Sequence, residues 1–576
     1  MAYCLGIAAL GHCNYDPTNP ALLYFSIGEA VAALSITLIV PQFLSPIYKF
    51  RLRCRLIREA HIYGCVLVAV LMVIFAAILP SLGVMSGAPW TYPIFWEAGA
   101  GIVFLLAVST LVFVATRPTK ASSVNMERFV SEAIALLAHA TDKDRAEFSR
   151  DLDACIYDMV RKADLRRQLW KPSAFVLFAK RRQLHNSDYA SAFLRVLSDP
   201  AFCRVLVRDM PWNTARILRE IAKYPTECQS ISEFVREIAR QAVLMEDSMF
   251  AREVEYKGFR ETAVISDALF GNPRLARFYE PLWGLSFGHT KDLDVGQVKR
   301  TSRALRLTLN SLLSAGAYWQ QHGLGGASDL ISLVTIDIRE RVRDDRVGYR
   351  LVSALTFDLF QMVDDTRKHV EELDSDTYTR LFFEPKDETE KKMVRDFTLL
   401  DEVAEMVVEF VFTFCNDFDG GDDPFWHSAI SINRHVFQRF GGNVSGFDPL
   451  QQRIALKLLQ KVDENLEGFY PAVTRMLLST IGSYEVPKEE NVNRPWELFV
   501  HAFFHRFQSF PALYEKNQEK AETYLPSNVR YDPKRRSIIK TYRGGKERET
   551  ILGDLNLPEV SVNDHLRLRA IDEETH

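Results

Sequence analysis

Three long apolar stretches lie in the first fifth of the chain, and each has the length of about 20 residues that a helix needs to cross a bilayer. They are Ala21–Leu44, Ile62–Val84 and Ile94–Thr116. The middle stretch contains no charged residue, whereas a buried helix of a soluble protein rarely stays uncharged for so long. The pattern therefore predicts three transmembrane helices.

Beyond residue 117, apolar positions recur every three or four residues, the spacing of one buried face of a helix. Phe129, Val130 and Ala133 follow this spacing, and Thr141 and Asp142 are suited to begin the next helix. Prolines indicate further helix boundaries, because the residue before a proline disfavours helix. Helices are predicted over Ser187–Leu197, Ala201–Asp209, Trp212–Tyr224, Ile231–Met245, Val298–Gln321, Leu330–Asp344, Arg346–Leu373, Glu388–Phe414, Pro449–Glu464 and Pro495–Phe510.

The C-terminal end differs from this helical pattern. Short strand-like segments over residues 529–531, 537–542 and 548–552 are separated by an Asp532-Pro533 turn and by Gly544-Gly545, a favoured hairpin sequence. They predict a small β-meander followed by a charged tail.

The predicted fold class is all-α, with a large helical region that forms an irregular solenoid or stacked bundles. Strands do not alternate with helices, and no repeat of fixed length emerges. Four segments are predicted: an extracytoplasmic tail over 1–20, the transmembrane region over 21–116, a helical cytoplasmic region over 117–525, and the meander with its tail over 526–576.

Composition and charge add one exclusion. The 576 residues are 47% hydrophobic and 25% charged, with a formal net charge of −4. No overall positive field recruits nucleic acid, so nucleic acid is not an expected partner.

The basic residues predict the orientation of the chain. Lys49, Arg51, Arg53, Arg55 and Arg58 lie between the first two apolar stretches, whereas residues 1–20 carry no lysine or arginine. The positive-inside rule then predicts a multi-pass protein of the plasma (inner) membrane, with its N-terminus outside and its C-terminal region in the cytoplasm. The basic segment is expected to rest on anionic lipid headgroups of the inner leaflet.

Two acidic residues interrupt the apolar stretches. Glu29 lies in the first stretch and Glu97 in the third, and small residues flank both. An acid within hydrocarbon is costly and is a candidate functional site. A hydrogen-bonded packing role is favoured over ion or proton conduction.

Sites for catalysis or metal binding are weakly indicated. Glu497, His501 and His505 are spaced four apart and share one helix face, as metal ligands can, but the pattern lacks the internal glutamate of HExxH enzymes. An ordinary polar surface is favoured there, and no cofactor is predicted. No phosphate-binding loop, dinucleotide fingerprint, nucleophile elbow or kinase motif is found, which favours a protein that is not an enzyme.

The resulting hypothesis is a membrane-anchored interaction, scaffold or sensor protein that presents a helical cytoplasmic domain to a protein partner. The alternative is an oligomeric channel or membrane-disrupting effector gated by that domain. Three helices seldom enclose a pore, so the alternative requires a homo-oligomer.

Overall fold

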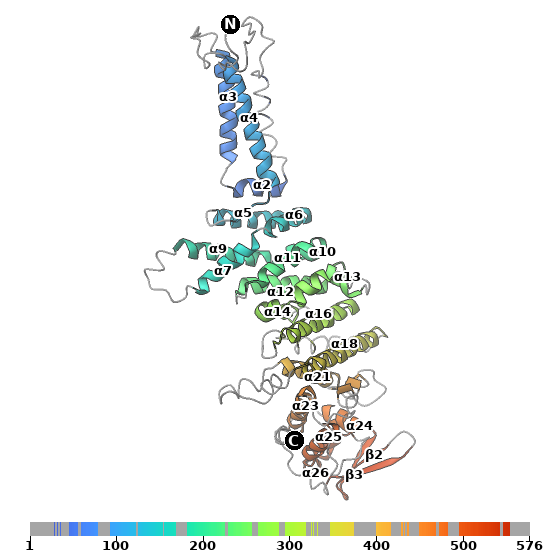
Figure 1. The fold of residues 1–576 in the computed structure, drawn as a ribbon. Helices are drawn as coiled ribbons and strands as arrows, with labels where there is room; N and C mark the ends of the chain where they lie inside the picture. Colours follow the sequence, from blue (N-terminus) through green and yellow to red (C-terminus); the bar gives the residue numbers. More distant parts are fainter. Residues whose placement is uncertain are drawn as a thin grey trace. The chain divides into compact units, whose positions relative to one another are not determined.

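The computed structural model divides the chain into two compact units, Met1–Tyr224 and Pro225–His576. The described residues are mainly helical, with a small sheet near the C-terminus (Figure 1), as predicted. The structure describes residues 45–55, 59–78, 93–121, 125–153, 155–168, 181–224, 228–255, 263–286, 294–317, 346–373, 399–415, 449–467, 472–481, 495–541 and 545–552, and also 28, 32, 35, 324, 327, 331, 428, 429, 431, 432, 435 and 436. The boundary at Tyr224 falls inside the predicted cytoplasmic region, so the apolar stretches and the first helices of that region share one unit.

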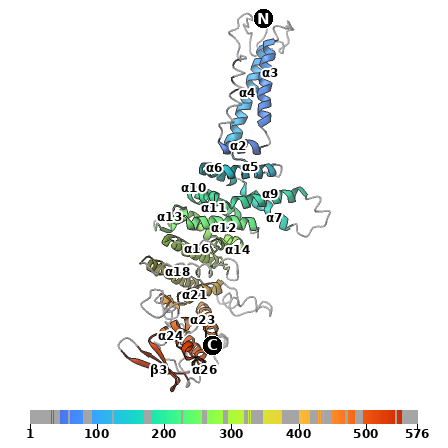
Figure 2. The same cartoon turned by 180° about the vertical axis from the view of Figure 1, so that it is seen from behind.

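Helices α3 (Glu59–Ile78) and α4 (Pro93–Thr116) run side by side in the first unit (Figures 1 and 2), and we call them the apolar hairpin. Ala69 and Val73 of α3 pack against Ala100 of α4. A Cβ atom added to Gly99 would lie 2.6 Å from Cε of Met72, so glycine permits this close approach. Small residues therefore let the two helices pack closely.

The outer surface of the apolar hairpin is apolar. Two helical spans, Ala60–Ile78 and Ile94–Val114, are long and apolar enough to cross a membrane, yet only 28% and 22% of their most apolar windows are buried. The described residues contain two such helices, not the three predicted. The first predicted stretch, Ala21–Leu44, lies outside the described residues except for Gly28, Ala32 and Ser35, which are helical.

Seven further helices are described in the first unit. Asp199 and Met210 precede helices that begin with proline, one residue before the predicted starts at Ala201 and Trp212. The Asp199 carboxylate accepts a hydrogen bond from the Phe202 backbone N–H at 2.9 Å. Proline suits the first position of a helix, because a backbone N–H at that position has no acceptor within the helix and proline lacks this N–H. The helices are α2 (Pro46–Cys54), α5 (Met126–His139), α6 (Asp142–Asp153), α7 (Ile156–Gln168), α9 (Arg181–Leu197), α10 (Pro200–Asp209) and α11 (Pro211–Ala222).

The second unit stacks helices in successive layers, from α12 to α23 in Figure 1. The helix predicted to end at Gln321 ends at Ser314, the helix predicted over Pro495–Phe510 is two helices, and Leu330–Asp344 lies outside the described residues except for Ile331. Its described elements are α12 (Gln229–Leu244), α13 (Met249–Glu255), the π-helix η7 (Ser266–Phe270), α14 (Pro273–Tyr279), α15 (Trp283–Ser286), α16 (Val295–Ser314), α18 (Arg346–Glu371), α21 (Leu399–Cys415), α23 (Pro449–Glu467), α24 (Ala472–Ile481), α25 (Pro495–Phe507), α26 (Phe510–Lys516) and α27 (Gln518–Glu522).

Ion pairs join α21 to α23 along one stripe, which we call the charge ladder. Acids four residues apart on α21 face bases four residues apart on α23, in the same order along both helices, so the two helices run parallel. The pairs are Asp401 with Arg453, Glu405 with Lys457, and Glu409 with Lys461. The side chains are partly buried, which strengthens these pairs relative to exposed ones.

We expect Glu405→Lys to destabilise the second unit by about 1–2 kcal/mol, because it places two ammonium groups together in the middle of the charge ladder. The double variant Glu405→Lys/Lys457→Glu restores the pairing and should recover most of that loss. Thermal unfolding of the full chain measures both. Equal destabilisation by the single and double variants would show that the ladder does not hold these helices together.

The C-terminal sheet has the order β1-β2-β3, and both strand pairs are antiparallel, as a meander requires. The strands are β1 (Val529–Asp532), β2 (Ser537–Thr541) and β3 (Glu547–Ile551). Gly545, before β3, has a φ of 77°, a left-handed conformation that glycine adopts without strain. Arginines of β1 and of the turn that follows it pair with acids of β3: Arg530 with Glu547 and Arg535 with Glu549.

Candidate functional site

Part of the predicted basic segment forms a helix, α2, in which Arg51 is buried, Lys49 is half-buried and Arg53 is exposed. Ile47, Phe50 and Cys54 share one face with Arg51, and all four are buried. Leu52 packs instead with Ile62 and Val114 at the base of the apolar hairpin. Helix α2 is therefore enclosed by the hairpin on one side and by α5 and α6 on another. We call this set of contacts the α2 junction.

Aromatic rings fill the α2 junction. The Phe50 ring lies 5.3 Å from the rings of both Phe129 in α5 and Phe148 in α6, with edge-to-face geometry. Phe193 of α9 contacts both of those rings, and Phe202 of α10 contacts Phe148. These rings are almost fully buried. One side chain of α2 thus belongs to the hydrophobic core of the helices that follow the apolar hairpin.

A buried ion pair lies beside this aromatic core. Nε and an Nη atom of Arg51 donate to the two carboxylate oxygens of Asp151 in α6, at 2.9 and 3.0 Å. The Arg51 and Asp151 side chains are only 8% and 0% exposed. Burial raises the pKa of Asp151, and the hydrogen bonds from Arg51 and Thr119 lower it in part. Such two-point pairing fixes the orientation of α2 against α6.

Two thiols are buried at the same place. Burial raises the pKa of both Cys54 and Cys155 far above the usual range for a thiol. A thiolate is the reactive form of cysteine, so neither side chain is prepared for nucleophilic, redox or metal chemistry.

Two further arginines gather at the end of α4. The Arg117 and Arg55 guanidinium carbons lie over the ring of Phe113, at 4.2 and 5.9 Å from its centroid. An Nη atom of Arg55 also donates to the Arg117 carbonyl oxygen at 2.8 Å. Burial is the main cause that lowers the pKa of Arg55, and the nearby Arg117 charge lowers it further. Arg53 lies apart from them and pairs with Glu132 at 3.2 Å.

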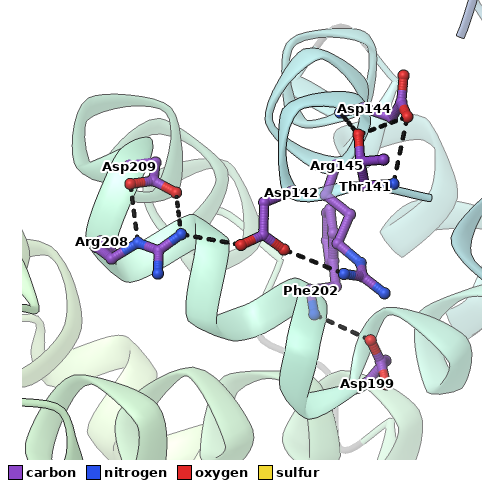
Figure 3. A network of polar contacts seen from close by, with 8 residues as sticks. All are labelled: Thr141, Asp142, Asp144, Arg145, Asp199, Phe202, Arg208 and Asp209. Carbon is purple, nitrogen blue, oxygen red and sulfur yellow. Dashed lines mark hydrogen bonds and ion pairs between the residues drawn. The ribbon is translucent and has the colours of Figure 1, made fainter. Parts of the chain in front are cut away.

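A polar network anchors the start of α6 to the end of α10 (Figure 3). Asp142 accepts hydrogen bonds from Arg208 at 3.1 Å and from Arg145 at 3.2 Å, and Arg208 also bonds Asp209. The hydrogen bond from Arg208 is the main cause that lowers the pKa of Asp142.

The two residues predicted to begin α6, Thr141 and Asp142, make different contacts. The Thr141 hydroxyl accepts from the backbone N–H of Asp144 and donates to its carboxylate, which caps α6 as predicted. Asp142 instead accepts the hydrogen bonds from Arg145 and Arg208. Together these contacts set the position of α6, and hence of Asp151 farther along it.

Of the remaining predicted site residues, the structure describes the side chains of Glu97 and His505. Glu97 is 4% exposed near the start of α4. Glu29, Arg58 and the side chains of Glu497 and His501 lie outside the described residues, whereas His505 is half-buried in α25. In the described part of the chain, no group of three histidine, cysteine or acidic side chains is arranged to hold a metal ion.

Serine and histidine side chains make polar contacts in the described residues of the second unit, but these residues do not form a catalytic triad. Ser302 bonds the Asp358 carboxylate, whereas His435 bonds the different carboxylate of Asp364 at 2.9 Å. Ser314 lies 3.3 Å from His369, whose second ring nitrogen faces the Asp365 backbone oxygen. That serine is exposed at the end of α16, and no described carboxylate bonds its histidine. These contacts join α16, α18 and the segment around His435.

No protein family, curated protein or solved structure matches this chain. The α2 junction is the strongest candidate functional site, because a helix with three basic residues connects an outwardly apolar hairpin to a packed helical body.

Proposed function

We propose that the protein is a membrane-anchored interaction or scaffold protein, not an enzyme, that presents its helical region to protein partners. The observation that carries this proposal is the apolar hairpin. Its two helices have the length of a bilayer crossing, yet most of their surface is not covered by protein. Exposure of such an apolar surface to water is unfavourable, whereas contact with lipid acyl chains is not. The surface therefore fits the interior of a bilayer.

The orientation follows from the charges at the base of the hairpin. Lys49, Arg51, Arg53 and Arg55 lie at this end, and Arg117 follows the last residue of α4. With the first apolar stretch as a further crossing, the positive-inside rule gives a multi-pass protein of the plasma (inner) membrane. Its N-terminus is then outside, and the helical region is in the cytoplasm.

The helical region is suited to be a binding platform. The charge ladder joins parallel helices, and a second stripe of polar contacts joins α16 to α18, in which Arg306 and Asn310 both bond Asp365. Contacts between successive parallel helices are typical of irregular solenoids, which bind partners over extended surfaces. We therefore propose a solenoid that displays a partner-binding surface beside the membrane.

The environment of Glu97 disfavours the channel alternative. Glu97 is buried by protein at the start of α4, an environment that fits a packing acid better than an acid that lines a water path.

Extraction of membranes with alkaline carbonate tests the anchor. We expect the full chain to stay in the membrane pellet, and Leu105→Arg/Leu106→Arg, which places two charges on the exposed face of α4, to lower the pelleted fraction severalfold. Phe357→Arg is the matched control, because Phe357 is equally exposed but lies in α18. A wild-type chain released by carbonate would refute the anchor.

Detergent purification from the native host should also yield a stoichiometric protein partner, and a purified chain without one would refute the scaffold function.

A further inference from the structure

Two arginines at the end of the apolar hairpin have no acidic partner among the residues that the structure describes. Arg55 and Arg117 both lie over the Phe113 ring. Within the described residues, neither guanidinium lies within ion-pair distance of a carboxylate, since both oxygens of nearby Asp151 accept from Arg51. Two adjacent cations without an anion repel each other, so their arrangement fits a ligand that carries negative charge.

The surroundings of the pair specify what kind of anion it is. Phe113 is 48% exposed, and its neighbour Val112 is exposed as well, within the apolar span that ends at Val114. The two guanidinium groups therefore lie at the boundary between an apolar surface and the polar residues that follow. An anion with an attached hydrocarbon chain matches both sides of that boundary, whereas a free inorganic ion matches one.

We propose that Arg55 and Arg117 together bind the phosphate of an anionic phospholipid, whose acyl chains lie against the exposed apolar surface of α4. Guanidinium groups bind phosphate through paired hydrogen bonds, and stacking on an aromatic ring pre-orients them. This inference rests on the proposed membrane anchor and deepens it. It assigns lipid binding to Arg55 and Arg117, whereas Arg51 and Arg53 pair with acids of the protein.

Native mass spectrometry of the full chain in an uncharged detergent tests this site. The probes are phosphatidylglycerol and phosphatidylcholine with identical acyl chains. We expect the wild type to prefer phosphatidylglycerol, and Arg55→Gln/Arg117→Gln to bind it about thirtyfold more weakly, the factor expected for two charges near an anionic headgroup. Arg53→Gln is the matched control, because Arg53 is an exposed arginine of α2, two residues before Arg55, but pairs with Glu132. It should change the affinity by less than about threefold.

The remaining outcomes each decide the question. Equal binding of both lipids, or an equal loss in Arg53→Gln, overturns the site. Displacement of the lipid by inorganic phosphate overturns the assignment to a phospholipid.

Arg55→Lys/Arg117→Lys keeps both charges and is the variant to use if the glutamine variant does not fold. It should bind more weakly than the wild type, because an ammonium group cannot form the paired bonds, and unchanged binding overturns the stacked geometry. A chain that resists carbonate extraction but shows no lipid preference refutes this inference alone, whereas a chain released by carbonate refutes the anchor.

Discussion

Replacement of Arg51 by methionine is expected to destabilise the first unit by about 3–5 kcal/mol at neutral pH. Methionine retains much of the length of the side chain and its packing. It removes two N–H donors, at 2.9 and 3.0 Å, from the carboxylate of Asp151, whose side chain is fully buried. The expected loss is thus the cost of an unpaired charge in the protein interior, which is far larger than that of a broken surface pair.

The same variant should regain stability as the pH falls. Burial raises the pKa of Asp151 and Arg51 lowers it in part, so removal of Arg51 raises this pKa further. A carboxyl whose pKa is higher in the folded than in the unfolded state stabilises the fold below its unfolded pKa. That contribution is lost as the pH rises through the folded pKa. Thermal unfolding should therefore show a smaller deficit of Arg51→Met relative to wild type at about pH 5 than at about pH 7.

Buried cysteines provide a local measurement of the same effect. Cys54 and Cys155 lie at the α2 junction, whereas Cys203 is buried in α10 of the same unit. In Arg51→Met we expect maleimide to label the first two thiols faster at neutral pH, with less change at Cys203. Arg51→Met/Asp151→Leu removes both charges of the buried pair and should stay within about 1 kcal/mol of wild type. Wild-type labelling rates in the single variant would mean that the ion pair does not hold α2 in place.

The parts of the fold that depend on nearby residues could be predicted from the sequence. Pro200 and Pro211 begin α10 and α11 because proline disrupts helix at the residue before it and suits the first helical position. The strands of the meander follow from short apolar segments on either side of a turn, and Gly545 supplies the left-handed conformation that the turn requires. In each case the signal and the structure lie within a few residues of each other.

The role of the basic segment could not be predicted in this way. Its charges alternate with apolar residues, a period of two that indicates a surface segment with one basic side. In a helix, successive side chains are about 100° apart, so Arg51 falls on the same face as Ile47, Phe50 and Cys54. Its partner Asp151 is 100 positions away in the sequence, and no local rule pairs the two residues. The charge ladder was missed for the same reason, although its acids and bases each repeat every four residues.

Replacement of Phe50 by alanine is expected to destabilise the first unit by about 3–5 kcal/mol. The ring is almost fully buried, and its two edge-to-face contacts at 5.3 Å link α2 to α5 and to α6. Alanine would leave a cavity that Phe129 and Phe148 cannot close without losing their contacts with Phe193. Phe50→Leu conserves most of the volume and should cost less than about 1.5 kcal/mol. Thermal unfolding of the full chain in detergent measures both values.

A second measurement separates the role of the ring from that of the anchor. The apolar hairpin has its own packing between α3 and α4, in which Phe50 takes no part. Phe50→Ala should therefore stay in the membrane pellet after carbonate extraction while its melting temperature falls. Phe95→Ala, at an exposed position of α4, should leave both unchanged. Loss of Phe50→Ala from the pellet would mean that the hairpin is not an independent anchor. An unchanged melting temperature would mean that α2 does not share the core of the helices beneath it.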